Sequence, residues 1–236
     1  MVAMRNKTKP GFTLMETVIA IGVLAVLITA FLAVFGPAAQ GIRRAINVQD
    51  ADRMVASLEK ELGILRPGES GENPWNTAFD KAFEWIEKAG KDDYILLYQY
   101  RGDPDTIRTD GTMDVYSAND GIPGQDYVVQ SMARLRSDTT FEEDLEGLIG
   151  RVFVVQTQQL VYGSDGLELG TEGKIVNMNP ADRGEQPDTA VDYKDAVIAF
   201  SAKFYAVAST SKNYIDQLDS NKLGKPVFTR NLGVRR

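Results

Sequence analysis

The sequence contains no cysteine and no histidine among its 236 residues. These absences exclude a Cys nucleophile, a Ser-His pair and a zinc site held by Cys or His. Chemistry on this chain would have to use carboxylates, Lys, Ser or Tyr. A bound metal would have to be a hard ion with oxygen ligands, such as calcium. Missing cysteines are compatible with an oxidising compartment without establishing one.

Positive charge is scarce beyond the N-terminus. The formal net charge is -7, yet residues 1–11 carry Arg5, Lys7 and Lys9 with no acid. The remainder of the chain is therefore more acidic than the whole. An acidic body repels the phosphate backbone, so the sequence argues against a broad nucleic-acid surface and predicts no nucleic-acid partner.

A long apolar run follows the basic start. No charged residue lies between Val18 and Phe35, and Thr29 is the only polar side chain there. At about 1.5 Å per residue, this run spans roughly 27 Å, close to the hydrocarbon thickness of a bilayer. We predict a transmembrane helix over about residues 12–36. Gly36-Pro37 predicts a kink or local unwinding just after it.

The residues Gly11-Phe12-Thr13-Leu14-Met15-Glu16 stand directly before the apolar run. Over about residues 5–40 the chain resembles the type IV pilin family, which includes the pseudopilins of type II secretion. The resemblance implies removal of a leader, residues 1–11, by prepilin peptidase after Gly11, and N-methylation of the new first residue, Phe12. It also implies assembly into a filament through the N-terminal helix and no enzymatic activity. Pro10 and Met15 depart from the family pattern.

Glu16 is a lone carboxylate at the edge of the apolar run. An ionisable group at membrane depth is a functional-site hypothesis by default. The predicted partner is the new amino group of Phe12 in a neighbouring subunit, because about 6 Å of helix separates the two residues within one chain. Pairing would offset desolvation and set the register of filament assembly. The alternative is a passive, solvated carboxylate at the headgroup boundary.

Two other interpretations of the N-terminus stay open. A conventional secretory signal would be cut near Pro37-Ala38-Ala39-Gln40, although its apolar core would exceed the usual length of about 7–15 residues. The other interpretation is an uncut membrane anchor. Under these interpretations the protein is a secreted or membrane-tethered ligand-binding protein that uses residues 1–39 only for export.

Beyond the apolar run, helical spacing of Val55, Leu58, Leu62 and Leu65 predicts an amphipathic helix that continues to about residue 65 and ends at Pro67-Gly68. Phe79, Phe83 and Ile86 predict a short helix within residues 75–90 whose stripe belongs to the core. The expected strands after this helix are 94–100, 127–135, 151–162, 196–207 and an edge strand at 226–232, with a further pairing segment at 174–178. A hairpin turn is expected at 163–166 and a short helix at 141–149. Loops are expected at 102–125 and 179–192.

This order of elements predicts an α+β protein. A long N-terminal transmembrane and amphipathic helix would pack on a mostly antiparallel β domain, which is a pilin-like layout. The expected segments are a leader at 1–11, the long helix at 12–66 and an extracytoplasmic globular domain at 67–236.

Acidic residues gather at three places. Asp105, Asp110, Asp114 and Asp120 lie in one expected loop, and Asp182, Glu185, Asp188 and Asp192 lie in another. Their spacing matches no EF-hand, so we interpret them as solvated loops and expect no cofactor, with calcium as the alternative. Glu142, Glu143 and Asp144 are interpreted as a solvated helix face rather than a glycosidase carboxylate pair.

The resemblance also implies partners and a location. The partners are prepilin peptidase, other pilin or pseudopilin subunits and an inner-membrane assembly platform. The location is the inner membrane, crossed once, with the globular domain in the periplasm and the protein incorporated in a filament. The chain is long for a major subunit, which favours a minor one. The choice between a secretion system and a pilus rests on family analogy alone.

Overall fold

The structure, a computed structural model, describes residues 13–67, 75–91, 93–118, 120–219 and 223–236. The chain divides into two compact units, Met1–Ile46 and Asn47–Arg236. Helix α1, Leu14–Leu62, contributes its first part to the first unit and its last part to the second.

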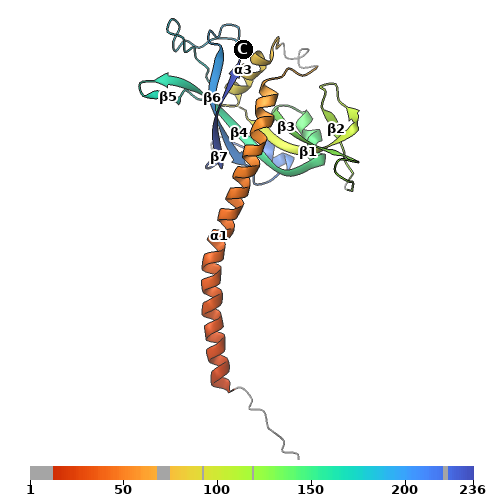
Figure 1. Cartoon of the computed structure of the whole chain (residues 1–236), viewed down its shortest axis with the longest axis vertical. Helices are drawn as coiled ribbons and strands as arrows, with labels where there is room; N and C mark the ends of the chain where they lie inside the picture. The colour runs from red at the N-terminus through yellow and green to blue at the C-terminus, as the bar shows by residue number, and fades with distance from the viewer. Residues whose placement is uncertain (1–12, 68–74, 92, 119, 220–222) are drawn as a thin grey trace, which may run out of the picture. The chain divides into compact units, whose positions relative to one another are not determined.

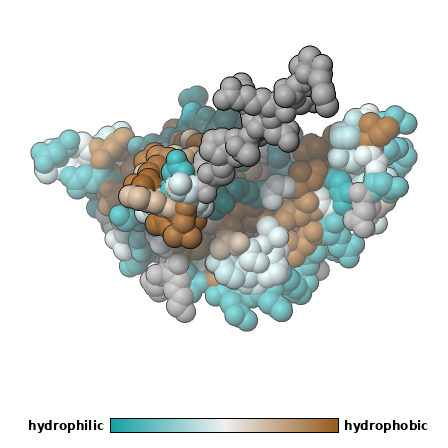
Figure 2. Space-filling view, turned by 90° about the horizontal axis from the view of Figure 1, so that it is seen from below, coloured by the Kyte–Doolittle hydropathy of each residue, from teal (hydrophilic) through white to brown (hydrophobic). Residues whose placement is uncertain are grey.

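In the first unit, α1 carries the apolar run on a surface without protein cover. The helix is long and apolar enough to cross a membrane, and large side chains such as Val26 and Phe31 are exposed in the isolated chain. Figure 2 shows apolar residues, in brown, gathered around the end of α1 that faces the viewer. A surface of this kind needs either lipid or other apolar helices around it.

The helix continues through Gly36 and Pro37, so the predicted local unwinding is wrong, while the alternative of a kink stays a prediction. Pro37 has no N–H and cannot donate to the carbonyl of Ala33. One missing hydrogen bond does not end a helix whose flanking turns remain bonded. At its other end α1 stops at Leu62, before the predicted Pro67-Gly68. Just after Leu62, Gly63 N still donates to Glu59 O (3.1 Å).

The second unit contains a seven-stranded sheet (Figure 1). The path β2-β1-β4-β6-β7 forms its backbone, while β3 pairs with β1 and β5 pairs with β4, and every pairing between the strands is antiparallel. The strands are β1 (Ile95–Ile107), β2 (Met113–Val115), β3 (Val128–Leu135), β4 (Leu148–Gly163), β5 (Gly166–Leu169), β6 (Val197–Ala206) and β7 (Phe228–Arg235). The predicted α+β layout of a long helix and a mostly antiparallel sheet is confirmed.

One face of the sheet packs against helices and forms the first core. The last part of α1 contributes Val55, Leu58 and Leu62 to it, as their spacing predicted. Helix α3, Ala78–Lys88, adds the stripe that includes Phe83 and Ile86. A reciprocal capping box of Thr77 and Asp80 starts α3 and fixes its N-terminal turn.

The opposite face forms the second core. Because side chains alternate along a strand, Ile95 and Leu97 of β1 belong to the first core, whereas Leu96, Tyr98 and Tyr100 belong to the second. Two short helices close this side: α4, Thr140–Asp144, and α5, Lys212–Asp216. They contribute Phe141 and Ile215, both buried, to the second core.

The predicted loop at 102–125 is partly wrong. β1 continues to Ile107 and pairs with β2 inside the expected loop. Gly102 makes this close approach feasible, since a Cβ there would lie 2.8 Å from Cβ of Met113. Tyr100 Oη also donates to Met113 O (2.7 Å). These contacts join residues that are distant in sequence, which local composition does not reveal.

Two further predictions fail in an informative way. Residues 174–178 form no strand, because the side chain of Gln159 takes the place of one: Nε2 donates to Val176 O (2.8 Å) and Oε1 accepts from Val176 N (2.8 Å). The helix expected at 141–149 ends at Asp144, and a 3₁₀ turn, Leu145–Gly147, leads directly into β4. The hairpin at 163–166 is confirmed by the pairing of Gly163 with Gly166.

Candidate functional site

The start of α1 is closed by a reciprocal set of hydrogen bonds between Thr13 and Glu16. Glu16 Oε2 accepts from Thr13 N and from Thr13 Oγ1, both at 2.9 Å. Thr13 Oγ1 in turn accepts from Glu16 N at 3.2 Å. This is a capping box, which satisfies backbone donors that would otherwise stay unpaired at the first helical turn. The spacing Thr-x-x-Glu is the sequence signal of such a box, which we had not predicted at this position.

Glu16 therefore has a local role in addition to the predicted assembly role. Gly11 and Phe12, the predicted cleavage and methylation residues, lie outside the described residues. The predicted pairing of Glu16 with a neighbouring Phe12 amine stays a prediction. The capping box shows only how the carboxylate is held in a single chain: it lies over the first turn, next to Thr13.

In the second unit, the interpretation of Asp144 as part of a solvated face is wrong. Asp144 is fully buried, while its neighbour Glu143 keeps an exposed side chain. Tyr98 Oη donates to Asp144 Oδ2, and Arg108 Nη1 lies 2.6 Å from Asp144 Oδ1. Burial, followed by the charge of Asp144, raises the pKa of Tyr98 well above its ordinary value. The phenol therefore stays protonated and acts as a donor.

Arg134 joins Asp144 to the surface. Its guanidinium contacts Asp110 Oδ2 (3.0 Å), Asp138 Oδ2 (3.0 Å) and Asp144 Oδ2 (3.4 Å). Burial opposes ionisation of Asp110, but hydrogen bonds from Thr112 and then Arg134 outweigh it and lower the pKa of Asp110. The sequence suggested Asp110 only as a loop residue and Asp144 only as part of a solvated helix face. Their partners come from a different strand, so no local pattern pointed to the network.

The contacts of the carboxylates in the two acidic loops bear on the alternative of calcium binding. Asp110 is bound to Arg134, and Asp114 lies 3.2 Å from Arg108, so arginines already occupy these carboxylates. In the other loop, Thr189 Oγ1 donates to Asp192 (2.7 Å). Within the described ranges, no group of three or more acidic side chains is arranged to hold a metal ion.

A second buried ion network links α1 to α3. Lys81 is fully buried, and its Nζ lies 2.7 Å from Glu61 Oε1 and 4.8 Å from the ring centroid of Trp85. Arg66 Nη2 holds the other oxygen of Glu61 at 2.6 Å. Burial raises the cost of the Glu61 charge, yet the hydrogen bonds and charges of Arg66 and Lys81 prevail and lower the pKa of Glu61.

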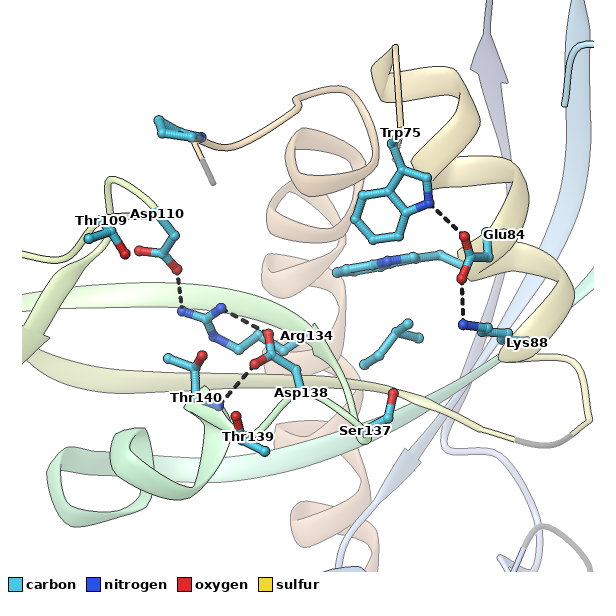
Figure 3. A pocket seen from close by; sticks show the side chains of 13 residues that line it. Trp75, Glu84, Lys88, Thr109, Asp110, Arg134, Ser137, Asp138, Thr139 and Thr140 are labelled. Carbon is cyan, nitrogen blue, oxygen red and sulfur yellow. Dashed lines mark hydrogen bonds and ion pairs between the residues drawn. The ribbon is translucent and has the colours of Figure 1, made fainter. Parts of the chain in front are cut away.

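A cleft of about 570 Å³ is lined by Asp110, Arg134 and Asp138 of the first network and by Trp85, whose ring lies near Lys81 (Figure 3). One wall comes from α3 and from Trp75, three residues before its start: Trp75 Nε1 donates to Glu84 (2.6 Å), which also pairs with Lys88. The other wall consists of Arg134 with Asp110 and Asp138 and a row of hydroxyl side chains. That row is Thr109, Ser137, Thr139 and Thr140.

The size of the cleft falls in the range of ligand sites, but its lining is mainly polar. Its acids, Glu84, Asp110 and Asp138, each contact a Lys or Arg. The low pKa of Asp110 opposes a role as a general acid, which requires a raised pKa. The arrangement is suited to holding a charged or polar group rather than to transferring a proton.

No protein-family model, no curated protein and no solved structure matches the chain.

Proposed function

We propose that the protein is a minor pseudopilin or pilin-like subunit of a type II secretion or type IV pilus filament. It is processed after Gly11, methylated at Phe12 and assembled through α1. It crosses the inner membrane once and places its globular domain outside the cytoplasm. Prepilin peptidase, related subunits and the assembly platform are its partners in this proposal, and its work is mechanical rather than enzymatic.

One observation carries the proposal. A carboxylate, Glu16, stands in the first turn of a helix whose next 18 or so residues are apolar and exposed in the single chain. The sequence Gly11-Phe12-Thr13-Leu14-Met15-Glu16 supplies the processing motif in front of it. The capping box would also suit a helix that only anchors or exports a domain, so the acid supports assembly together with the processing motif rather than alone.

The N-terminal mass of the native protein tests the processing step. Mass spectrometry of the terminal peptide should find a chain that begins at Phe12 and carries one added methyl group. A start near Gln40 would mean that a conventional signal is removed and the filament proposal fails. A start at Met1 would support the uncut anchor instead.

The substitution Glu16→Ala tests assembly. We expect it to abolish incorporation into filaments, measured by shearing filaments from cells and quantifying the subunit in the sheared fraction and in the membrane. Glu59→Ala is the matched control, because Glu59 is an exposed acid on the same helix. If both variants enter filaments like the natural protein, Glu16 has no assembly role and the tether interpretation gains support.

A further inference from the structure

Two arginines follow the apolar run of α1, and they are the only charged residues between Glu16 and Asp50. Arg43 and Arg44 belong to the first unit and are exposed. Neither has a charged partner among the residues that the structure describes. We propose that Arg43 and Arg44 bind phosphate groups of the membrane leaflet beside them and so fix the depth of α1 in the bilayer. This inference rests on the membrane crossing in the proposed function.

The backbone of Arg43 lies just outside the layer of lipid headgroups. Phe35, the last residue of the apolar run, is about 12 Å away from Arg43 along the helix axis. The headgroups add about 5–7 Å to each side of the hydrocarbon core. With Phe35 at the edge of that core, a gap of roughly 5–7 Å separates the backbone of Arg43 from the headgroup layer.

The side chains of both arginines can close this gap. In an α-helix the Cα–Cβ bonds tilt toward the N-terminus, and long side chains extend over the residues three and four positions earlier. The N-terminal part of α1 carries the apolar run, so this tilt directs the guanidinium groups toward the membrane. Ala39 and Gly41 are the small residues on their path, and a Cβ placed on Gly41 would meet nothing within 4 Å.

The chemistry of the pair suits phosphate. A guanidinium is a planar fork that binds two phosphate oxygens at once. Consecutive residues of a helix project roughly 100° apart, so Arg43 and Arg44 reach two different lipids. A lipid with a net negative headgroup is favoured over a zwitterionic one, because no amine of its own competes for the phosphate.

The position of the pair also fits the other polar end of the membrane segment. Glu16 and Arg43 are about 40 Å apart along the helix axis, and a bilayer with its headgroups is about 40–45 Å thick. A carboxylate near one headgroup layer and two guanidinium groups near the other limit how far the helix can slide. The basic residues of segment 1–11 outnumber the pair, so the proposed orientation is kept.

The lipid preference of the full-length chain tests this inference. The protein is reconstituted into phosphatidylcholine vesicles with a trace of spin-labelled phosphatidylglycerol or spin-labelled phosphatidylcholine. Electron spin resonance then measures the fraction of each label that the protein immobilises. We expect the double substitution Arg43→Gln and Arg44→Gln to lower the preference for phosphatidylglycerol at least twofold, to order of magnitude.

Arg53→Gln is the matched control, because Arg53 is exposed and lies farther along the same helix. It should leave the lipid preference unchanged. The basic residues of segment 1–11 are present in every variant and contribute the same background. Fluorescence of Trp75 and Trp85 should also be the same in every variant, since the substituted arginines are exposed.

Salt gives an independent readout. In about 1 M NaCl the Debye length falls to about 3 Å, so the difference between the natural protein and the double variant should shrink to less than about half. A difference that 1 M salt leaves unchanged would contradict an electrostatic contact with the headgroups.

The same lipid preference in the double variant and in the natural protein would overturn the inference, and so would an equal loss in Arg53→Gln. An unchanged preference together with loss of the double variant from filaments would assign the arginines to a neighbouring subunit instead. A chain that begins at Phe12 but shows no arginine-dependent preference would refute only this contact. A native chain that begins near Gln40 lacks the apolar run, so it would refute the filament role whatever the vesicles show.

Discussion

Replacing the buried carboxylate Asp144 by asparagine should unfold the second unit far more easily. The variant removes the charge that faces Arg108 and Arg134 and weakens the acceptor of Tyr98. Deleting one partner of a buried ion pair typically costs about 3–5 kcal/mol. Arg134 keeps Asp110 and Asp138, and asparagine retains one acceptor oxygen. We therefore expect a loss of about 2–3 kcal/mol in the free energy of unfolding.

Urea unfolding of the full-length protein in detergent measures this loss. The only two tryptophans, Trp75 and Trp85, are buried in the second unit and report on it by fluorescence. With a urea dependence of about 2 kcal/mol per M, the midpoint should fall by about 1–1.5 M. Glu143→Gln is the matched control, because Glu143 precedes Asp144 and contacts the same Arg108 (3.4 Å) but is exposed.

The control should change stability by less than about 0.5 kcal/mol, as exposed ion pairs contribute little. If Asp144→Asn and Glu143→Gln shift the midpoint equally, the buried network does not stabilise the domain.

Two further predictions concern the buried ion networks of the second unit. Lys81→Met should lower the free energy of unfolding by about 1–3 kcal/mol, because Glu61 stays buried with Arg66 as its remaining charged partner. Lys88→Met, on the exposed side of α3, is the control. It should change the free energy of unfolding by less than about 0.5 kcal/mol in the same urea assay. Glu61 and Asp110 have lowered pKa values in the folded protein, so the unfolded chain binds more protons and stability falls as pH drops below their ordinary values of 4.5 and 3.8. Urea midpoints between pH 7 and pH 3 should show this loss, with a shallower slope for Glu61→Gln; a rise in stability on acidification would contradict the assignment.

The sequence was most informative where periodicity is long and uninterrupted. The apolar run after Glu16 and the stripe of Val55, Leu58 and Leu62 identified α1, and a high content of β-branched, aromatic and other apolar residues identified the central strands. Turn chemistry at Gly163–Gly166 located the hairpin. In these places the local pattern and the tertiary packing favour the same structure, so local reasoning was sufficient.

Contacts between distant segments explain the failures. Asp144 sits in a short acidic stretch that suggests a solvated helix, and only the approach of Tyr98, Arg108 and Arg134 makes it a buried ion. The end of β1 was hidden in an Asp- and Gly-rich segment, because its strand character depends on pairing with β2. The cleft likewise joins α3 to the ends of β1 and β3, which no spacing rule connects.

The capping box at the start of α1 leaves half of the Glu16 carboxylate uncommitted. Both donors from Thr13 meet the same oxygen, Oε2, and the other oxygen accepts no hydrogen bond from the described residues. A single chain can thus secure its first helical turn and still offer one acceptor to a donor from elsewhere. Adding a subunit beside it would not require this turn to be remade, so helix formation and helix recognition can use one side chain at once.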